Sequence, residues 1–345
     1  MDIKLKFKKI ITSFIGKNYA RWPKVKYNSF IPVHYNRIKS YNPDIIYSHD
    51  LTTLPVSEML AKEIGCKLVF DSHELEAHRN PPLSPRQKQQ VESVERKLLP
   101  KCDAVTTVCQ SIADILEYEY KLKDIGLIYN APYVSGGKSH PRWDSRKGIN
   151  IRLDAKLEKT DFILVYVGLI TVNRGIEFVL DAMVHLPEHI KLIAVGPGQS
   201  KIKKTLKNYA KKLELGKRFI ILPPVNPPDV YSYISKADAS IIPIAPATLS
   251  YELALPNKFF ESAFSGLPII SADLIEIKKF IEKYKLGVTY DALNVQDLSR
   301  AISEVESNIN KYKPSNENVT KFKNKYGWES QEPYMLSLLE RLTNE

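Results

Sequence analysis

One arginine in the second half of the chain stands where an apolar segment gives way to a helical pattern. Residues 162–167 are continuously apolar, Gly168 begins a loop, and Arg174-Gly175 opens a stretch with helical spacing. The N-terminus of a helix attracts anions, and a guanidinium can donate two hydrogen bonds to one phosphate. Arg174 is therefore a candidate phosphate ligand, although an arginine at a helix start is more often a surface residue.

The most specific pattern is a short helical stretch that begins at Pro256 and ends at Gly266. Proline suits the first position of a helix and glycine suits its end. Asn257 and Lys258 then lie in the first turn, and Glu261 follows on the same face, where its carboxylate can accept two hydrogen bonds from a diol. A surface Lys–Glu pair explains the helix alone. Gly266, however, leads directly into an apolar run that we expect to be a buried strand, and this context favours a binding site over a surface pair.

Two further stretches follow apolar runs. Gly196-Pro197-Gly198 comes after residues 190–195, and its glycines would let the backbone turn and approach a ligand, although a plain turn is an equal alternative. Asp71-Ser72-His73-Glu74 ends an apolar run in the first half, where His73 can bond a ligand hydroxyl or titrate near neutral pH. A capped strand end with a satisfied histidine is as good an explanation. His49-Asp50 is a similar, weaker case.

Two regions alternate short apolar runs with helical patterns, which is typical of parallel sheets with crossover helices. The strands that we expect are 44–49, 67–71, 103–108 and 126–129, then 162–167, 190–195, 219–222, 239–242, 268–271 and 288–290. The fold class is thus α/β, with two Rossmann-like, doubly wound parallel-sheet domains. Such sheets bind ligands at the carboxyl ends of their strands, so the cleft between the domains is the expected site.

Glycine and proline punctuation divides the chain into four parts. Residues 1–135 form the first domain, 136–160 a linker, 161–325 the second domain, and 326–345 a C-terminal helix that packs back toward the first domain.

Composition limits the class of protein. The apolar share of 43% and charged share of 26% are those of a globular protein, and no run reaches the roughly 18 apolar residues of a membrane helix. The N-terminus lacks a signal-peptide pattern, and Cys66, Cys102 and Cys109 have no metal spacing, so we expect reduced thiols and a cytoplasmic location.

The formal net charge of +11 calls for an acidic partner. Residues 1–26 mix lysines with apolar side chains, which would suit contact with the inner face of a membrane, or equally an ordinary solvated element. Nucleic acid is a poor candidate partner, because no binding module or aromatic stacking pattern accompanies the lysines.

Taken in order, these stretches resemble glycosyltransferase family 4, a group of retaining enzymes with the GT-B fold. The resemblance runs from about Pro43 to the C-terminus. Six short matches carry it: Pro43-Asp44-Ile45-Ile46-Tyr47-Ser48-His49-Asp50, Asp71-Ser72-His73-Glu74, Tyr129-Asn130-Ala131-Pro132, Asn173-Arg174-Gly175, Gly196-Pro197-Gly198 and Pro256-Asn257-Lys258-Phe259-Phe260-Glu261.

The resemblance implies a role for each candidate residue. Arg174 and Lys258 would hold the diphosphate of a nucleoside-diphosphate-sugar donor, with Asn257 at the helix start, and His73 would lie over the transferred sugar; these three side chains, His73, Arg174 and Lys258, are the catalytic candidates. Glu261 would bind the ribose. Gly168, Gly196 and Gly198 would let the backbone approach the nucleotide. Glu74 and Glu252 are candidate sugar contacts, and family members need no metal or other cofactor.

Two departures from the family stand out. Many members carry a glutamate eight residues before the one matched by Glu261, where this chain has Leu253 with Glu252 beside it. Either Glu252 substitutes, or the sugar is held differently. Family members also open with a strand and a glycine-rich loop, whereas only about 43 residues precede the first clear strand here and Gly16 is the only glycine before Gly65. We therefore expect an abbreviated first domain, with its opening unit missing or rebuilt.

Three hypotheses follow. The first is a glycosyltransferase that acts on a glycan or lipid-linked acceptor in surface polysaccharide or glycoconjugate synthesis. The second is a non-catalytic GT-B-like subunit that binds a nucleotide sugar or supports a partner enzyme, which the short first domain and Leu253 favour. The third is a nucleotide-sugar epimerase, for which the sequence offers no acid–base carboxylates. The retained Arg174, Lys258, Glu261 and His73 favour the enzyme.

Overall fold

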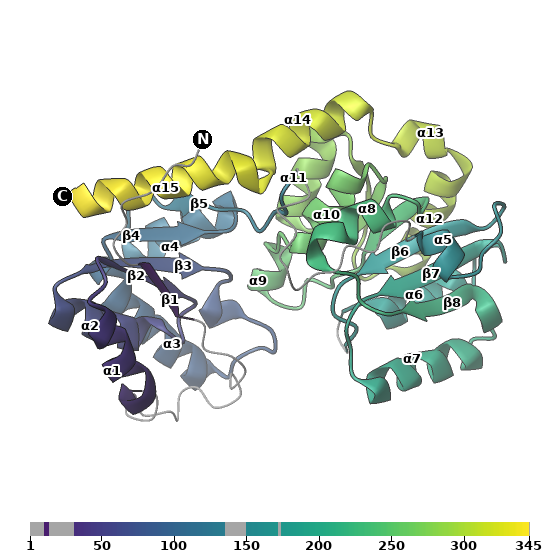
Figure 1. Ribbon diagram of the computed structural model, residues 1–345. Helices are drawn as coiled ribbons and strands as arrows, with labels where there is room; N and C mark the ends of the chain where they lie inside the picture. The colour runs from purple at the N-terminus through teal and green to yellow at the C-terminus, as the bar shows by residue number, and fades with distance from the viewer. Residues whose placement is uncertain (1–9, 14–30, 135–149, 172–173, 345) are drawn as a thin grey trace. The chain divides into compact units, whose positions relative to one another are not determined.

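The computed structural model describes residues 10–13, 31–134, 150–171 and 174–344 (Figure 1). The chain forms two compact units. The first contains residues up to Tyr129 together with Ala247–Leu253 and Gln331–Glu345, and the second contains Asn130–Pro246 and Ala254–Ser330. These bounds differ from the expected ones: 247–253 belongs to the first unit, the second unit already begins at Asn130, and the C-terminal part of the first unit begins at Gln331 and not at 326.

The first unit is built on a five-stranded parallel sheet whose described strands lie side by side in sequence order. These strands are β1 (Ile10–Ser13), β2 (Ile45–His49), β3 (Lys67–Ser72), β4 (Ala104–Thr107) and β5 (Gly126–Leu127). Its helices are α1 (Ile31–Tyr41), α2 (Leu54–Ile64), η3 (Glu76–His78), α3 (Pro85–Leu98), η4 (Leu99–Lys101), α4 (Gln110–Tyr120), α9 (Leu249–Glu252) and most of α15 (Trp328–Asn344).

We expected the opening unit of the first domain to be missing or rebuilt, and strand β1 shows that an opening strand is present. Ile10 to Ser13 pair in parallel with Ile45 to Ser48 of β2. The run is only four residues long and lies among lysines, so its pattern suggested an amphipathic segment, whereas its β-branched residues suit a strand once a neighbour is available to pair with. Among the described residues, the first unit begins with β1, α1 and β2; residues 1–9 and 14–30, Gly16 included, lie outside that range.

The C-terminal helix α15 covers one face of this sheet. Alternate side chains of β2 and β3, namely Ile45, Tyr47 and Val69, pack against Leu339 and Leu342 of α15 in one apolar cluster. Figure 1 shows α15 on one side of the sheet and α1, α2 and α3 on the other. The last helix of the chain thus completes the core of the first unit.

The second unit contains a six-stranded parallel sheet in the order β11-β10-β9-β6-β7-β8. The strands are β6 (Phe162–Val167), β7 (Ile190–Val195), β8 (Phe219–Leu222), β9 (Ala239–Ile242), β10 (Ile269–Ala272) and β11 (Gly287–Tyr290). Strand order reverses between β6 and β9, as in a doubly wound sheet, so this switch point is the expected ligand position. β6 is buried along its whole length, as its continuous apolar run predicts.

Helices pack around this second sheet. They are α5 (Ile151–Asp154), α6 (Ile176–Met183), α7 (Ser200–Lys212), η5 (Gly216–Arg218), η6 (Pro227–Asp229), α8 (Val230–Ile234), α10 (Asn257–Ser265), α11 (Ile275–Tyr284), α12 (Val295–Ser307), α13 (Ile309–Tyr312) and α14 (Asn316–Tyr326). Ile151 of α5 is fully buried against the core of this unit, so the end of the expected linker is an ordered part of the second unit. Residues 135–149 lie outside the described range.

We expect the α15 contact to be a main source of stability for the first unit. The Leu339 side chain is 1% exposed in its apolar cluster, so Leu339→Ala should lower the free energy of unfolding by about 2–5 kcal/mol through lost burial and a residual cavity. Glu340→Ala, at the exposed next position, is the matched control. Urea unfolding checks this, and equal stability of the two variants would contradict the assigned packing.

Candidate functional site

The carboxyl ends of β6 and β7 approach each other so closely that only glycine fits. A Cβ atom placed on Gly196 would lie 1.9 Å from the carbonyl oxygen of Gly168, and Gly196 has a φ of 154°. A Cβ atom on Gly198 would lie 2.5 Å from the carbonyl oxygen of Ile170. These glycines therefore permit close approach between the backbones of the two loops; their approach to a ligand stays a prediction.

Lys258 reaches this position from the first turn of α10. Its Cε atom would lie 3.5 Å from a Cβ atom on Gly168, so the lysine packs against the end of β6. The ammonium lies 4.1 Å from the ring centroid of Tyr166, and Lys258 is 8% exposed. Within the described part of the chain, its Nζ atom has no hydrogen-bond partner. A buried ammonium in this state is costly unless an anion binds next to it.

The pKa values of Lys258 and Glu261 are consistent with a site for an anion. Burial and the positive charge of Arg174 lower the pKa of Lys258 to about 7, while Glu261 acts in the opposite direction. Burial also raises the pKa of Glu261 to about 7, against the effect of Lys258. Both groups therefore change protonation state near neutral pH, where an added anionic ligand would shift the balance.

Arg174 lies just before α6 rather than in its first turn. The helix begins at Ile176, and Gly175 is its N-cap in a left-handed conformation with a φ of 78°. A Cβ atom on Gly175 would lie 1.7 Å from the carbonyl oxygen of Pro243, directly after β9. The start of α6 is thus pressed against the switch point between β6 and β9. Val172 and Asn173 lie outside the described residues.

Lys203 is a neighbour of the glycine turn that the sequence pattern did not single out. It lies on α7, and its ammonium donates a hydrogen bond of 3.1 Å to the carbonyl oxygen of Gly196. The only signal in the sequence is its place in the first turns of the helix after Gly198. The second unit therefore brings Gly168, Gly196, Gly198, Arg174, Lys258 and Glu261 to the carboxyl ends of one sheet, with Asn257 exposed at the start of α10.

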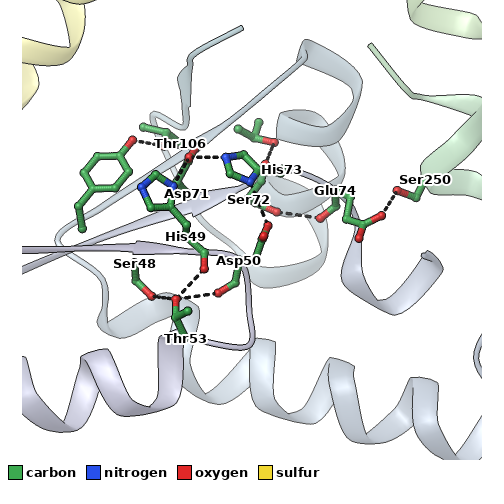
Figure 2. Close-up of polar contacts among 12 residues, drawn as sticks. Ser48, His49, Asp50, Thr53, Asp71, Ser72, His73, Glu74, Thr106 and Ser250 are labelled. Atoms are coloured by element: carbon green, nitrogen blue, oxygen red, sulfur yellow. Dashed lines mark hydrogen bonds and ion pairs between the residues drawn. The ribbon is translucent and has the colours of Figure 1, made fainter. Parts of the chain in front are cut away.

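The first unit carries a separate polar cluster at the ends of β2, β3 and β4 (Figure 2). The buried Asp71 carboxylate is its centre: Oδ2 lies 2.9 Å from His73 Nε2 and 3.0 Å from His49 Nδ1. Thr106 donates a hydrogen bond of 2.7 Å to Oδ1 of Asp71 and lies 3.1 Å from the hydroxyl of Tyr47. Although burial opposes ionisation of Asp71, hydrogen bonds from His49 and His73 hold its pKa well below the usual range.

His73 does not titrate near neutral pH, contrary to one expectation from the sequence. Its Nδ1 atom lies 3.3 Å from Asp50 Oδ1, while its Nε2 atom bonds Asp71. These two hydrogen bonds raise the pKa of His73 to about 10. The His73 ring also stacks on that of His49, with 5.5 Å between centroids.

His49, Asp71 and His73 also place three potential metal-ligand atoms within 4.8 Å of one another. The ion pairs and hydrogen bonds above already use these atoms. The expectation that the protein needs no metal stays a prediction.

Glu74 and the segment around Glu252 belong to the same unit. Ser250 of α9 donates a hydrogen bond of 3.5 Å to Oε2 of Glu74 (Figure 2). Glu252 is half-buried at the end of α9. Leu253 is 3% exposed, and its carbonyl oxygen accepts a hydrogen bond from the thiol of Cys109. The leucine found where the family has a glutamate is therefore a packing residue.

Comparison with solved structures shows a shared fold. A sucrose-phosphate synthase from Thermosynechococcus elongatus is 16% identical, with 91% of this chain and 77% of that chain covered and a TM-score of 0.71. The Anabaena protein HepE, in complex with UDP and glucose, is 15% identical over 92% of this chain and 84% of that chain, also with a TM-score of 0.71. A glycosyltransferase from Rickettsia africae is 14% identical over 95% and 84%, with a TM-score of 0.69.

Two family profiles match the sequence. The profile of glycosyl transferases group 1 matches residues 149–322, just over half of the chain, and that of glycosyltransferase family 4 matches residues 9–131. A search of curated proteins found no match. The two parallel-sheet units fit the GT-B fold of the structural neighbours. The chain belongs to the glycosyl transferases of group 1, and it is a family 4-like glycosyltransferase.

Proposed function

We propose that this glycosyltransferase is a retaining hexosyltransferase that uses a nucleoside-diphosphate sugar as donor and a glycan or lipid-linked acceptor, in surface polysaccharide or glycoconjugate synthesis. The observation that carries the donor assignment is the buried ammonium of Lys258, which lies beside Gly168 and has no hydrogen-bond partner among the described residues. A diphosphate at the carboxyl ends of β6 and β7 would supply the missing negative charge.

The proposed chemistry depends on positioning and on charge. Lys258 and Arg174 would stabilise the negative charge that develops on the departing diphosphate, which is where fixed cations lower a barrier most. Glu261 would accept the ribose hydroxyl hydrogens. The leaving phosphate oxygen would take the proton of the acceptor hydroxyl on the same face of the sugar, so the reaction needs no pair of catalytic carboxylates. The proposed reaction uses no metal.

Uridine is the first donor base to test. HepE from Anabaena has been solved with UDP, with UDP and glucose, and with UDP-glucose. We therefore propose UDP-sugars as the first donors, with the sugar left open.

A non-catalytic role is the second candidate. The buried position of Leu253 favours it, because this side chain cannot replace a glutamate that contacts sugar hydroxyls. Slow hydrolysis of a nucleotide sugar in the absence of acceptor would distinguish the enzyme from a binding subunit.

The donor site can be tested with alanine variants. Arg174→Ala and Lys258→Ala should each lower the initial rate of donor hydrolysis or transfer by about a hundredfold, because each removes a side-chain cation that would stabilise the charge of the departing diphosphate. They should also reduce the increase in melting temperature that UDP causes. Lys204→Ala, an exposed lysine on α7, is the control for charge. Full activity of both site variants, with intact circular dichroism, would disprove the phosphate site.

The donor affinity should depend on pH. The protonated form of Lys258 pairs with the diphosphate, and the pKa of this group is lowered to about 7, so binding must take up a proton at higher pH. Affinity for UDP should fall roughly tenfold between pH 7 and pH 8.5. Lys258→Arg should remove this dependence because a guanidinium stays charged. Calorimetry in two buffers with different ionisation enthalpies measures the proton uptake, and its absence in the wild type would contradict the prediction.

Below pH 7 a second effect enters. The pKa of Glu261 is raised to about 7, so this carboxyl becomes protonated as the pH falls and loses acceptor capacity for a diol. Glu261→Gln should remove any loss of affinity below pH 7. It should also move the loss above pH 7 to lower pH, because the Glu261 charge that raises the pKa of Lys258 is then absent.

We also propose a cytoplasmic location with peripheral contact to the inner face of a membrane through residues 1–26. The net charge of +11 supports attraction to anionic lipid. Within the described residues, no helix is long and apolar enough to cross a bilayer. Residues 1–9 and 14–30 lie outside the described range.

Charge reversal tests the membrane contact better than deletion, because deletion would also remove β1. Substitution of Lys4, Lys6, Lys8 and Lys9 by glutamate should abolish flotation with vesicles that contain anionic lipid. The control reverses four lysines of α7: Lys201, Lys204, Lys207 and Lys211. An equal loss in both variants would indicate a general charge effect and refute a specific role of the N-terminal segment.

A further inference from the structure

Both ring nitrogens of His73 lie next to carboxylates. Nε2 is 2.9 Å from Oδ2 of Asp71, and Nδ1 is 3.3 Å from Oδ1 of Asp50. A carboxylate can only accept a hydrogen bond, and a neutral imidazole carries a single N–H. Only the doubly protonated ring can donate to both oxygens. Between two ionised carboxylates, the geometry therefore points to an imidazolium that donates both of its N–H groups (Figure 2).

We propose that Asp50 and Asp71 are positioning residues that clamp His73 as a fixed imidazolium, so that His73 serves transfer through a permanent positive charge and not as a base or through its ring nitrogens. This inference rests on the proposed transferase function. It changes the role that the family resemblance suggested for His73, because no ring nitrogen is left for a sugar hydroxyl.

The backbone turns the Asp50 carboxylate toward the ring. Asp50 has a φ of 58°, a left-handed conformation that is unusual for a residue other than glycine. Its N–H donates to the carbonyl oxygen of Asp71 at 2.9 Å, and its carbonyl oxygen accepts from the N–H of Thr53 at 3.1 Å. The hydroxyl of Thr53 donates to the carbonyl oxygen of His49 at 2.6 Å. Such a turn at the end of β2 is maintained by its surroundings, as expected at a functional site.

The other half of the clamp is fixed by three neighbouring strands. Strand register places His49 of β2 opposite Asp71 of β3, and Asp71 opposite Thr106 of β4. His49 and Thr106 therefore hold the two carboxylate oxygens of Asp71 from either side, and Tyr47 contacts Thr106. An anchored carboxylate of this kind restricts the ring that bonds it, which is how outer residues usually orient a functional histidine.

The carboxylates that bond His73 favour the protonated ring, although burial opposes it. Asp50 and Asp71 are its two carboxylate partners, and His49 stacks on it. Burial raises the pKa of Glu76 to about 8, although its ion pair with Arg79 at 2.9 Å acts in the opposite direction. The His73 side chain remains 36% exposed. A ligand that reaches this exposed part meets a fixed positive charge, which favours a group that is electron-rich or gains negative charge during the reaction.

The direct test follows His73 by NMR. With the ring resonances assigned through His73→Gln, the wild-type imidazole should stay protonated up to pH 9. Asp50→Asn is the key variant, since asparagine tolerates the left-handed conformation and keeps the side-chain size while it removes the charge. Its His73 should titrate at least one pH unit lower.

The chain offers a matched control in Asp124→Asn. Asp124 is exposed and also left-handed, with a φ of 55°, and it makes no ion pair with His73. This variant should leave the His73 titration unchanged. A wild-type His73 that titrates near pH 6.5, or an Asp50→Asn variant with an unaltered titration, would overturn the clamp.

Turnover measurements separate this inference from the proposed function. In the wild type, kcat should show no ionisation of His73 between pH 6 and pH 9. In Asp50→Asn, kcat should fall at the alkaline end of this range while the KM for donor stays within about twofold, because the variant changes the charge of His73 and not the diphosphate site. Transfer by the wild type with an identical pH profile in Asp50→Asn would refute the positioning role alone. No transfer or hydrolysis by the wild type would refute the proposed function, whatever the NMR result.

Discussion

A buried ammonium that lacks a hydrogen-bond partner is the interaction on which the candidate donor site depends. Lys258 is 8% exposed, its Nζ atom has no such partner in the described range, and Arg174 adds repulsion. Such a group destabilises an unliganded fold. The surrounding structure tolerates it because the Tyr166 ring offers a favourable face and Gly168 leaves room for the lysine stem. An anionic ligand would convert this cost into binding energy.

The polar cluster of the first unit follows the opposite principle. Asp71, His73 and Asp50 satisfy one another, and Thr106 completes the network. Self-satisfied buried networks are rigid, whereas an unsatisfied group is available for a ligand. The two units therefore contribute different physical properties. The first holds a charge that its own residues already pair, and the second holds a buried cation that a bound anion would pair.

The sequence predicted the strands of both sheets well, because fully buried parallel strands leave continuous apolar runs such as 162–167. It failed at β1, where four residues among lysines carry too little periodicity to reveal a strand that exists only because β2 pairs with it. Helix starts depend on local and on distant residues. Ser84 caps α3 with its own side chain, whereas α6 begins two residues after Arg174 because Gly175 takes a left-handed conformation against Pro243.

By itself, the sequence determined the fold class, the family and the residue types that could bind a diphosphate. These follow from the order of the apolar runs and from the spacing of residues within short motifs. Only the tertiary structure decided the state of those groups. Whether Lys258 is solvated or buried, and whether His73 is a neutral imidazole or a clamped imidazolium, depends on Tyr166, Asp50 and Asp71 in three dimensions. Burial and charge act through space over a few ångströms, and sequence spacing does not encode which distant residues supply them.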